Sequence, residues 1–151
     1  KQWNEQPNNI ISNFKNSKKI NQEIIRGEIK PLCIDLELAS ICDLACPHCF
    51  REYILTPDKV MSFDVYTKII DEIQKMGVPS IKLNWRGEPL LNSKIDEYIK
   101  YAKLKGILEV SINTNATNLD AKMAKKLISS GLDLIIYSFD GGTKKTYEKK
   151  I

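Results

Sequence analysis

Long apolar runs are absent from this 151-residue chain, and their absence argues against a membrane protein. No stretch approaches the roughly 18 consecutive apolar residues that a bilayer-spanning helix needs. The polar start, KQWNEQPNN at residues 1–9, also lacks the apolar core of a secretory signal peptide. We therefore expect no membrane-spanning segment and a cytoplasmic location.

Blocks of like charge are missing too. Lys and Arg number 23 against 19 Asp and Glu, which leaves a net charge of +4. The basic stretches KNSKK (15–19) and KKTYEKK (144–150) are short and fit solvated helix faces or loops. Nucleic acid is therefore not an expected partner. With 42% apolar and 28% charged residues, the chain has the composition of a folded globular protein.

Cysteine and histidine are scarce, yet they are concentrated. Three of the four cysteines and the single histidine fall in the stretch CDLACPHC, Cys42–Cys49. Such a cluster does not form a disulfide framework in a chain of this size, and in a reducing compartment it more often binds metal or does redox work. Cys33 stands apart in an apolar stretch, where we expect a small buried side chain.

Strand-like and helix-like segments alternate from residue 31 onward. The strand candidates are rich in apolar and β-branched residues, and the helix candidates carry apolar residues at three- and four-residue steps. The expected strands are 31–38, 80–85, 108–114 and 132–139; the expected helices are 62–76, 93–105, 121–130 and a helix start within 142–151. This alternation is typical of βα units, so the predicted fold class is α/β with a parallel sheet and four βα units.

Residues that cap helices delimit these segments. Ser62 is expected to begin the first helix and Gly77 to end it. Asn118 is expected to cap the helix over 121–130, and Gly131 to end it. Residues 1–30 are polar and contain one short helix candidate at 10–25, so we treat them as an N-terminal extension to a domain over 31–151.

Four polar stretches follow the four expected strands: CDLACPHC, RGEP, NTNAT and SFDGG. Right-handed crossovers place the turns after parallel strands along one edge of the sheet, where α/β folds bind their ligands. We therefore expect these four stretches to form one site.

The C-x3-C-x2-C spacing of Cys42, Cys46 and Cys49 leaves two metal chemistries open. An iron–sulfur cube is usually held by four thiolates, so three would leave one iron with an open position. Zinc is the alternative, with His48 as a fourth ligand in a zinc-stabilised α/β binding module. Because His48 adjoins Cys49, both side chains reach one tetrahedral ion only with difficulty. Metal-free redox thiols are a third reading.

These stretches resemble the motifs of the radical S-adenosylmethionine (SAM) enzymes. CDLACPHC resembles the C-x3-C-x-Φ-C loop, with His48 at the usual aromatic position; RGEPLL resembles the G-G-E-P turn, NTNAT the T-N-G-T stretch and SFDGGTKKTYEK the S-x-D-G segment. The resemblance covers residues 32–150 and is closest to members with a SPASM or twitch extension and to molybdenum-cofactor biosynthesis enzymes. Two positions depart from it, since Arg86 and Ala116 replace glycines.

The resemblance implies a cofactor pair and a reaction. The thiolates of Cys42, Cys46 and Cys49 would hold a [4Fe-4S] cluster, and SAM would complete the fourth iron. Reductive cleavage of SAM would then give a 5′-deoxyadenosyl radical for hydrogen abstraction from an unknown substrate. An electron donor such as flavodoxin or ferredoxin is implied, and the substrate would be a peptide, a sugar or a small metabolite.

SAM contacts follow from the same resemblance. The implied cofactor-binding residues are His48, Gly87, Glu88, Pro89, Thr114, Asn115 and Ser138. The backbone of 87–89 would meet the SAM ammonium, Ser138 the ribose or carboxylate, and His48 the adenine. Thr114 and Asn115 would reach SAM or substrate.

Three neighbouring side chains have two readings each. Asp140 either joins the site or caps the last helix. Arg86 either binds a substrate anion or forms a salt bridge at the barrel rim. Trp85 either lines the pocket with Asn84 or anchors the core.

Four βα units are fewer than the family's six-stranded partial barrel contains. We therefore expect the chain to be the N-terminal part of a larger enzyme, with strands five and six and any C-terminal cluster domain lying beyond it. The apolar run LIIYSF (134–139) fits a strand buried on both faces. Standing alone, the same strand would be an open apolar edge.

Overall fold

The computed structural model describes residues 30–54 and 57–148. Backbone contacts divide the chain into two units, Lys1–Pro31 and Leu32–Ile151, and the described helices and strands all lie in the second. The helix expected at 10–25 lies outside the described residues. In the part of the chain that the structure describes, none of the helices is both long and apolar enough to cross a membrane.

Four parallel strands form one sheet in the order β1-β2-β3-β4. They are β1 (Cys33–Asp35), β2 (Ser80–Lys82), β3 (Glu109–Thr114) and β4 (Leu134–Tyr137). Each lies within an expected strand and is shorter than it. Since consecutive strands are neighbours and run parallel, every connection crosses back over the sheet, as the βα alternation predicts.

Helices follow the strands at the expected places. They are α3 (Phe63–Met76), α4 (Ile95–Leu104), α5 (Ala121–Ser130) and α6 (Lys144–Tyr147), with short 3₁₀ helices η1 (Phe50–Tyr53) and η2 (Pro89–Leu91). Ser62 caps α3 through a hydrogen bond from the Val65 N–H, and Gly77 ends it in the left-handed conformation, as expected.

The expected cap Asn118 is wrong, and so is the reading of Asp140 as a cap. Asp120, not Asn118, caps α5, because its carboxylate accepts the Met123 N–H at 2.6 Å. Thr143, not Asp140, caps α6 in a capping box with Thr146. The side chain of Asn118 makes a long-range contact instead, which is described with the site below.

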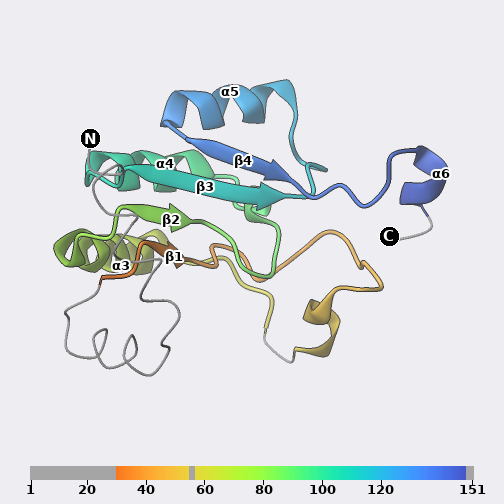
Figure 1. Ribbon diagram of the computed structural model, residues 1–151, viewed down its shortest axis with the longest axis horizontal. Helices are drawn as coiled ribbons and strands as arrows, with labels where there is room; N and C mark the ends of the chain where they lie inside the picture. The colour runs from red at the N-terminus through yellow and green to blue at the C-terminus, as the bar shows by residue number, and fades with distance from the viewer. Residues whose placement is uncertain (1–29, 55–56, 149–151) are drawn as a thin grey trace, which may run out of the picture. The chain divides into compact units, whose positions relative to one another are not determined.

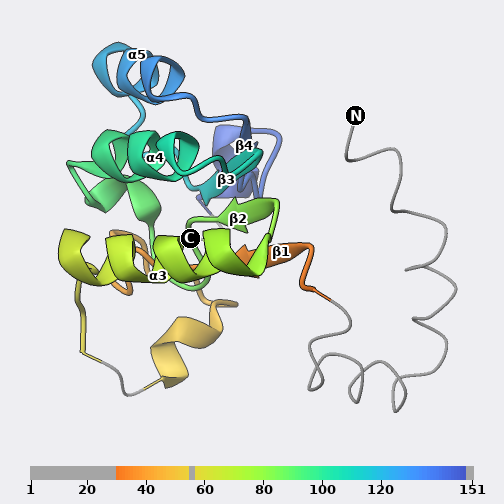
Figure 2. The same ribbon diagram turned by 90° about the vertical axis from the view of Figure 1, so that its left-hand side faces the viewer.

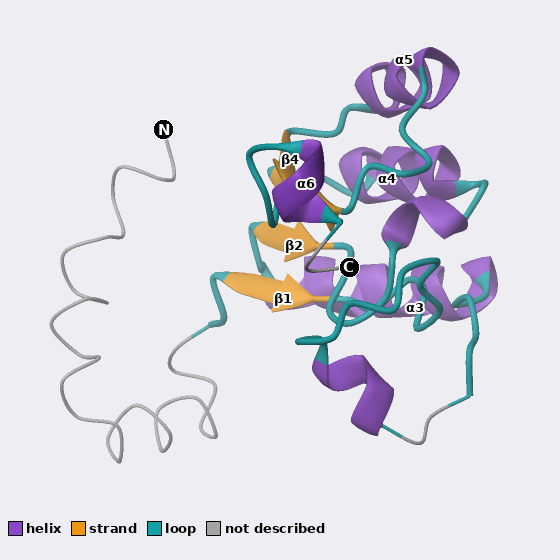
Figure 3. Ribbon diagram, turned by 90° about the vertical axis from the view of Figure 1, so that its right-hand side faces the viewer, coloured by secondary structure: helices purple, strands orange, loops and turns teal. Residues whose placement is uncertain are grey.

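Helices α3, α4 and α5 cover one face of the sheet (Figures 2 and 3). Their apolar stripes pack against the strands and exclude water, which is the main source of stability. The sheet side of this core contains Ile81, Leu83, Val110 and Ile112; the helix side contains Tyr66, Ile70, Ile73, Ile95, Tyr98, Ile99, Ala102 and Leu127. The edge strands depart from two sequence expectations.

Strand β4 is not buried on both faces, so that expectation is wrong for the described structure. Leu134, Ile136 and Tyr137 each expose 44–46% of their surface, and Phe139 exposes more. Strand β4 stands at the end of the strand order, and within the described residues β3 is its one neighbour in the sheet. It is therefore the open apolar edge that the four-unit count predicts. At the opposite edge, Cys33 is exposed rather than buried.

Ala116 has a left-handed backbone conformation, with φ of +64°, directly after β3. Glycine adopts this conformation without steric cost, whereas a Cβ makes it unfavourable. The conformation explains why the resembled T-N-G-T motif has glycine where this chain has alanine.

We expect Tyr66→Phe to lower the free energy of unfolding by about 1 kcal/mol, because the buried Tyr66 hydroxyl donates to the Tyr98 carbonyl at 2.9 Å. Burial, with the neighbouring Tyr98 adding to it, raises the pKa of Tyr66, so the hydroxyl remains a donor. Urea unfolding measures the loss. Tyr101→Phe is the control: Asp71, which accepts from Tyr101, keeps its ion pair with Lys105, so a smaller loss is expected. Equal losses would contradict this account.

Ala116→Gly is expected to raise the free energy of unfolding by about 0.5–1 kcal/mol, because it removes a left-handed alanine. The matched reverse change is Gly106→Ala, where φ is +84° and no atom lies within 4 Å of an added Cβ. Only backbone strain acts there, so a loss of about 1 kcal/mol is expected. Urea unfolding of both variants checks the pair. A destabilised Ala116→Gly variant would contradict the claim that the left-handed backbone at Ala116 lowers the stability of the protein.

Candidate functional site

The carboxyl ends of all four strands point to the same edge of the sheet (Figure 1). The segments that follow them carry the cysteine loop after β1, Arg86–Pro89 after β2, Asn115–Asn118 after β3 and Ser138–Gly142 after β4. The four polar stretches singled out in the sequence therefore meet at one edge, as parallel topology requires.

The cysteine loop, residues 41–49, connects the β1 side of the sheet to η1 without regular secondary structure. All three cysteines are half-buried, and the Cys49 N–H donates to the Cys46 carbonyl at 2.9 Å. Burial raises the pKa of the Cys42 and Cys46 thiols above their ordinary values, with nearby carboxylates adding to the effect. The Cys42 and Cys46 thiols are therefore protonated at neutral pH without a metal, and a metal that binds them releases protons.

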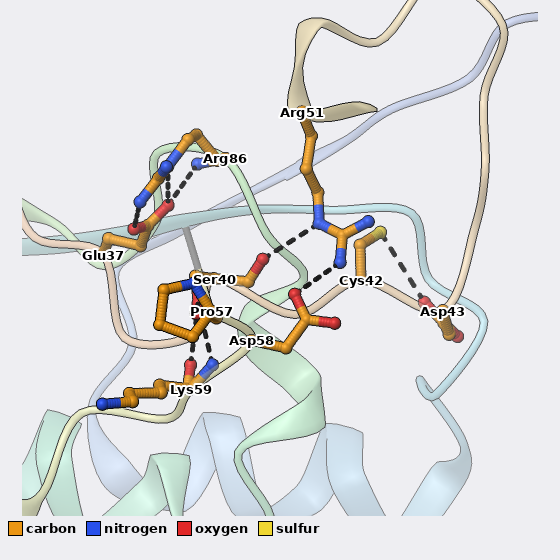
Figure 4. A network of polar contacts seen from close by, with 9 residues as sticks. All are labelled: Glu37, Ser40, Cys42, Asp43, Arg51, Pro57, Asp58, Lys59 and Arg86. Atoms are coloured by element: carbon orange, nitrogen blue, oxygen red, sulfur yellow. Dashed lines mark hydrogen bonds and ion pairs between the residues drawn. The ribbon is translucent and has the colours of Figure 1, made fainter. Parts of the chain in front are cut away.

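Arg51 closes the base of this loop (Figure 4). Its Nε donates to the Ser40 carbonyl at 3.0 Å, and its Nη2 donates to Asp58 at 2.7 Å. The Ser40 hydroxyl donates to the Pro57 carbonyl at 3.0 Å and accepts the Lys59 N–H at 2.9 Å. Because the beginning and the end of the loop are joined, the cysteines lie on a tethered segment.

Asp43 joins the cysteine loop to the segment after β3. Its carboxylate accepts from Asn115 Nδ2 at 2.8 Å, from Asn118 Nδ2 at 3.0 Å and from the Thr117 hydroxyl. Partial burial acts to raise the pKa of Asp43, but hydrogen bonds from Thr117, Asn115 and Asn118 lower it below its usual value. The carboxylate is therefore ionised at neutral pH, and hydrogen bonds from three side-chain donors stabilise its charge.

Gly87 brings the turn after β2 against the start of the cysteine loop. A Cβ at this position would lie 2.1 Å from the Ala39 carbonyl oxygen and 2.5 Å from that of Ile41. The next residue, Glu88, donates its N–H to the Ile41 carbonyl at 2.9 Å. Only glycine permits so close an approach of two backbones.

The Glu88 carboxylate is buried and bonded within the protein. One oxygen accepts from the Leu90 N–H at 3.0 Å and the Thr114 hydroxyl at 2.7 Å, and the other accepts from the Asn115 N–H at 2.8 Å. Three donors satisfy a charge that would otherwise be costly to bury. Glu88 thus fixes the turn after β2 to the end of β3.

Arg86, one of the two departures from the motif, forms the salt bridge that was one of its two readings. Its Nε donates to Glu37 at 2.7 Å, its backbone N–H donates to the same carboxylate, and its Nη2 pairs with the second oxygen (Figure 4). Both side chains are largely buried. The guanidinium is held in place by a carboxylate from the cysteine-loop side of the site.

Trp85 is exposed, so its reading as a core anchor is wrong. Its ring meets Phe50 edge-to-face with centroids 6.0 Å apart, and the Arg86 guanidinium lies 5.1 Å from its centroid. Asn84 is buried and accepts the Asn113 N–H at 2.8 Å.

The segment after β4 reaches the site through two contacts. His48 Nε2 lies 3.6 Å from Asp140 Oδ2, which gives an ion pair when the imidazole is protonated. The Ser138 N–H donates to the Thr114 carbonyl at 2.9 Å, which places Ser138 beside the end of β3.

Within residues 30–54 and 57–148, no group of three or more His, Cys, Asp or Glu side chains is arranged to hold a metal ion. The structure therefore brings the loops together but not the three sulfur atoms. The donor set itself fits an iron–sulfur cluster, since it offers three thiols on one tethered loop. His48, the fourth ligand of the zinc alternative, lies beside Asp140 instead.

Sequence reasoning missed two carboxylates that organise the site. Asp43 lies inside the cysteine loop opposite the amide-rich run NTNATN, and this pairing of an acid with amides was its signal. Glu37 follows β1 and pairs with Arg86, which follows β2. Opposite charges on separate segments have no fixed sequence spacing, so the sequence does not reveal such a pair.

Relatives of known name match part of the chain. The tungsten-containing aldehyde ferredoxin oxidoreductase cofactor-modifying protein of Pyrococcus furiosus is 32% identical over 108 residues, which is 70% of this chain and 30% of that protein. A probable GTP 3′,8-cyclase of Methanococcus maripaludis is 36% identical over 115 residues, 76% of this chain and 38% of that protein. The chain thus spans about a third of the length of these relatives.

A solved structure shares the fold. Streptococcus suis SuiB bound to S-adenosylmethionine, a SPASM-type protein, superposes with a TM-score of 0.68 at 21% identity, over 97% of this chain and 33% of SuiB. The predicted α/β fold with a parallel partial barrel is confirmed by this likeness and by the four-stranded sheet.

The family model of the radical SAM superfamily matches residues 36–151. Proteins of this family are enzymes that use a [4Fe-4S] cluster and SAM, so the two cofactors expected from the sequence are confirmed at the level of the family. The zinc-stabilised binding module is not supported. This chain belongs to the radical SAM superfamily.

Proposed function

We propose that the chain is the core part of an enzyme that binds a [4Fe-4S] cluster through Cys42, Cys46 and Cys49 and cleaves SAM reductively to abstract hydrogen from a substrate. The observation that carries the proposal is the hydrogen-bonded connection of three motifs. Glu88 bonds the turn after β2 to Asn115, and Asn115 bonds Asp43 inside the cysteine loop. A connection of this kind holds the cluster ligands and the SAM-binding edge in fixed positions relative to each other.

Three thiolates suit the cluster because they leave one iron without a protein ligand. Cys42, Cys46 and Cys49 would hold the other three irons, and the open iron would be free for the amino and carboxylate groups of SAM. When bound, the cluster and SAM supply one-electron cleavage of a sulfonium and hydrogen abstraction from carbon. The chain's own residues position these groups and limit the access of water to them.

The SAM contacts proposed are His48, Gly87, Glu88, Pro89, Thr114, Asn115 and Ser138. At the turn after β2 the contact is made by the backbone of residues 87–89, because the Glu88 carboxylate is already bonded to three protein donors. Backbone carbonyls suit the ammonium of SAM, which is a cationic donor. Thr114 contributes indirectly, since its hydroxyl donates to the Glu88 carboxylate at 2.7 Å. Ser138 lies beside Thr114, because its N–H donates to the Thr114 carbonyl.

The chain spans about a third of the length of its relatives, so its partners and substrate are proposed for the protein that carries it. We propose an electron donor such as flavodoxin or ferredoxin, because reductive cleavage needs one electron from outside. A peptide is one substrate class to test, since SuiB has been solved with its precursor peptide SuiA. Sugars and small metabolites are the other classes.

After anaerobic reconstitution we expect the protein that carries this chain to hold about four irons and four sulfides per site and to form methionine and 5′-deoxyadenosine with dithionite. Cys46→Ala is expected to lose the iron and the SAM cleavage. Cys33→Ala is the control, because Cys33 lies on β1 outside the loop. Iron and sulfide analysis with product chromatography gives the result. Zinc-loaded, iron-free protein under anoxic handling would refute the proposal.

Gly87→Ala is expected to lower SAM affinity at least tenfold, because its Cβ forces the turn away from the Ala39 carbonyl. Gly142→Ala is the matched control, since no atom lies within 4 Å of a Cβ there. Equilibrium dialysis of SAM against the reconstituted proteins measures the affinity. Equal SAM binding by the two variants would show that the close approach is unnecessary.

A further inference from the structure

We propose that Asn115 sets the reduction potential of the cluster by donating an amide N–H to the sulfur of Cys42, with Asp43 as the positioning residue for that amide. The inference rests on the proposed function, since it assigns a role toward the cluster held by the cysteine loop. It concerns the ease of cluster reduction rather than cluster binding itself.

The geometry of the Asn115 amide is the first support. Asn115 Nδ2 lies 2.8 Å from Asp43 Oδ1 and 3.9 Å from Cys42 Sγ. An amide nitrogen has two hydrogens, so Nδ2 can donate to the carboxylate and still has a hydrogen for the sulfur. The side-chain oxygen of Asn115, Oδ1, accepts the Thr117 N–H at 3.0 Å, which fixes the nitrogen end of the amide toward the cysteine.

The charge around Cys42 is the second support. Asp43 Oδ1 lies 4.0 Å from Cys42 Sγ, so an ionised carboxylate adjoins a sulfur that becomes a thiolate when it binds iron. Like charges this close disfavour any further gain of negative charge. The Asn115 amide nitrogen lies beside both groups, 2.8 Å from the carboxylate oxygen and 3.9 Å from the sulfur, and its partial positive hydrogens offset that repulsion. The same donor stabilises the reduced, more negative cluster and so raises its potential.

Asn118 supplies an internal comparison. Its Nδ2 donates to the other oxygen of Asp43 at 3.0 Å, so the two amides share one carboxylate. Of this pair, only Asn115 has its amide within hydrogen-bond distance of the Cys42 sulfur in the described structure. A role limited to holding the cysteine loop would make the two residues equivalent, whereas a role toward the sulfur separates them.

The test measures the midpoint potential of the reconstituted cluster without SAM, by redox titration followed with electron paramagnetic resonance. Asn115→Ala removes the donor without adding charge, and Asn118→Ala is its matched control. Asn115→Asp keeps the acceptor oxygen for Thr117 but loses the donor. Asn118→Asp adds the same charge beside the same carboxylate. Iron content is measured for every variant.

The expected result is about a tenfold smaller equilibrium constant for reduction in Asn115→Ala, a shift of about 59 mV to more negative potential, with iron content unchanged. The midpoint potential of Asn115→Asp is expected to be more negative than that of Asn118→Asp, and the potential of Asn118→Ala is expected to equal that of the parent. Equal shifts at 115 and 118, or a parent-like potential in Asn115→Ala, would overturn the inference. Folded Asn115 variants that bind no iron would also overturn it, because a tuning hydrogen bond leaves binding intact. A parent protein without a cluster would instead defeat the proposed function.

Discussion

The buried carboxylate of Glu88 is the interaction on which the arrangement of this edge depends. It accepts hydrogen bonds from Leu90, Thr114 and Asn115, which come from two different strand ends. A buried charge with this many donors is satisfied only in one geometry, and loss of any donor leaves it partly unpaired at a cost of about 1–3 kcal/mol. The turn after β2 and the end of β3 are therefore fixed relative to each other before a ligand arrives.

The cysteine loop is held differently, at its ends and at one point along its length. Arg51 joins its two ends, and Asp43 ties it to the segment after β3. Between these points the loop has no regular secondary structure, and its sulfur atoms are not gathered around one centre. Such a loop suits ligands that converge when the metal binds, because only a short tethered segment must be ordered.

Local patterns in the sequence predicted the fold well and the contacts across the site poorly. The helices over 63–76 and 121–130 follow from apolar spacing and from glycines that end them, which are short-range signals. Asn118 was expected to be a cap because its type and position fit, but Asp43, distant in the chain, takes its amide. The exposure of β4 was misjudged for the same reason, since burial depends on neighbours that an apolar run does not identify.

The pairing of Glu37 with Arg86 constrains how this site can vary. The two side chains expose only 12% and 18% of their surface, so replacing either one alone leaves the charge of the other without this partner in a poorly solvated position. A glycine at position 86, which the resembled motif has, would remove the cationic partner of Glu37. We therefore expect the residue types at positions 37 and 86 to change together among related chains. An acidic residue at 37 with an arginine at 86 would then help to recognise chains of the same lineage.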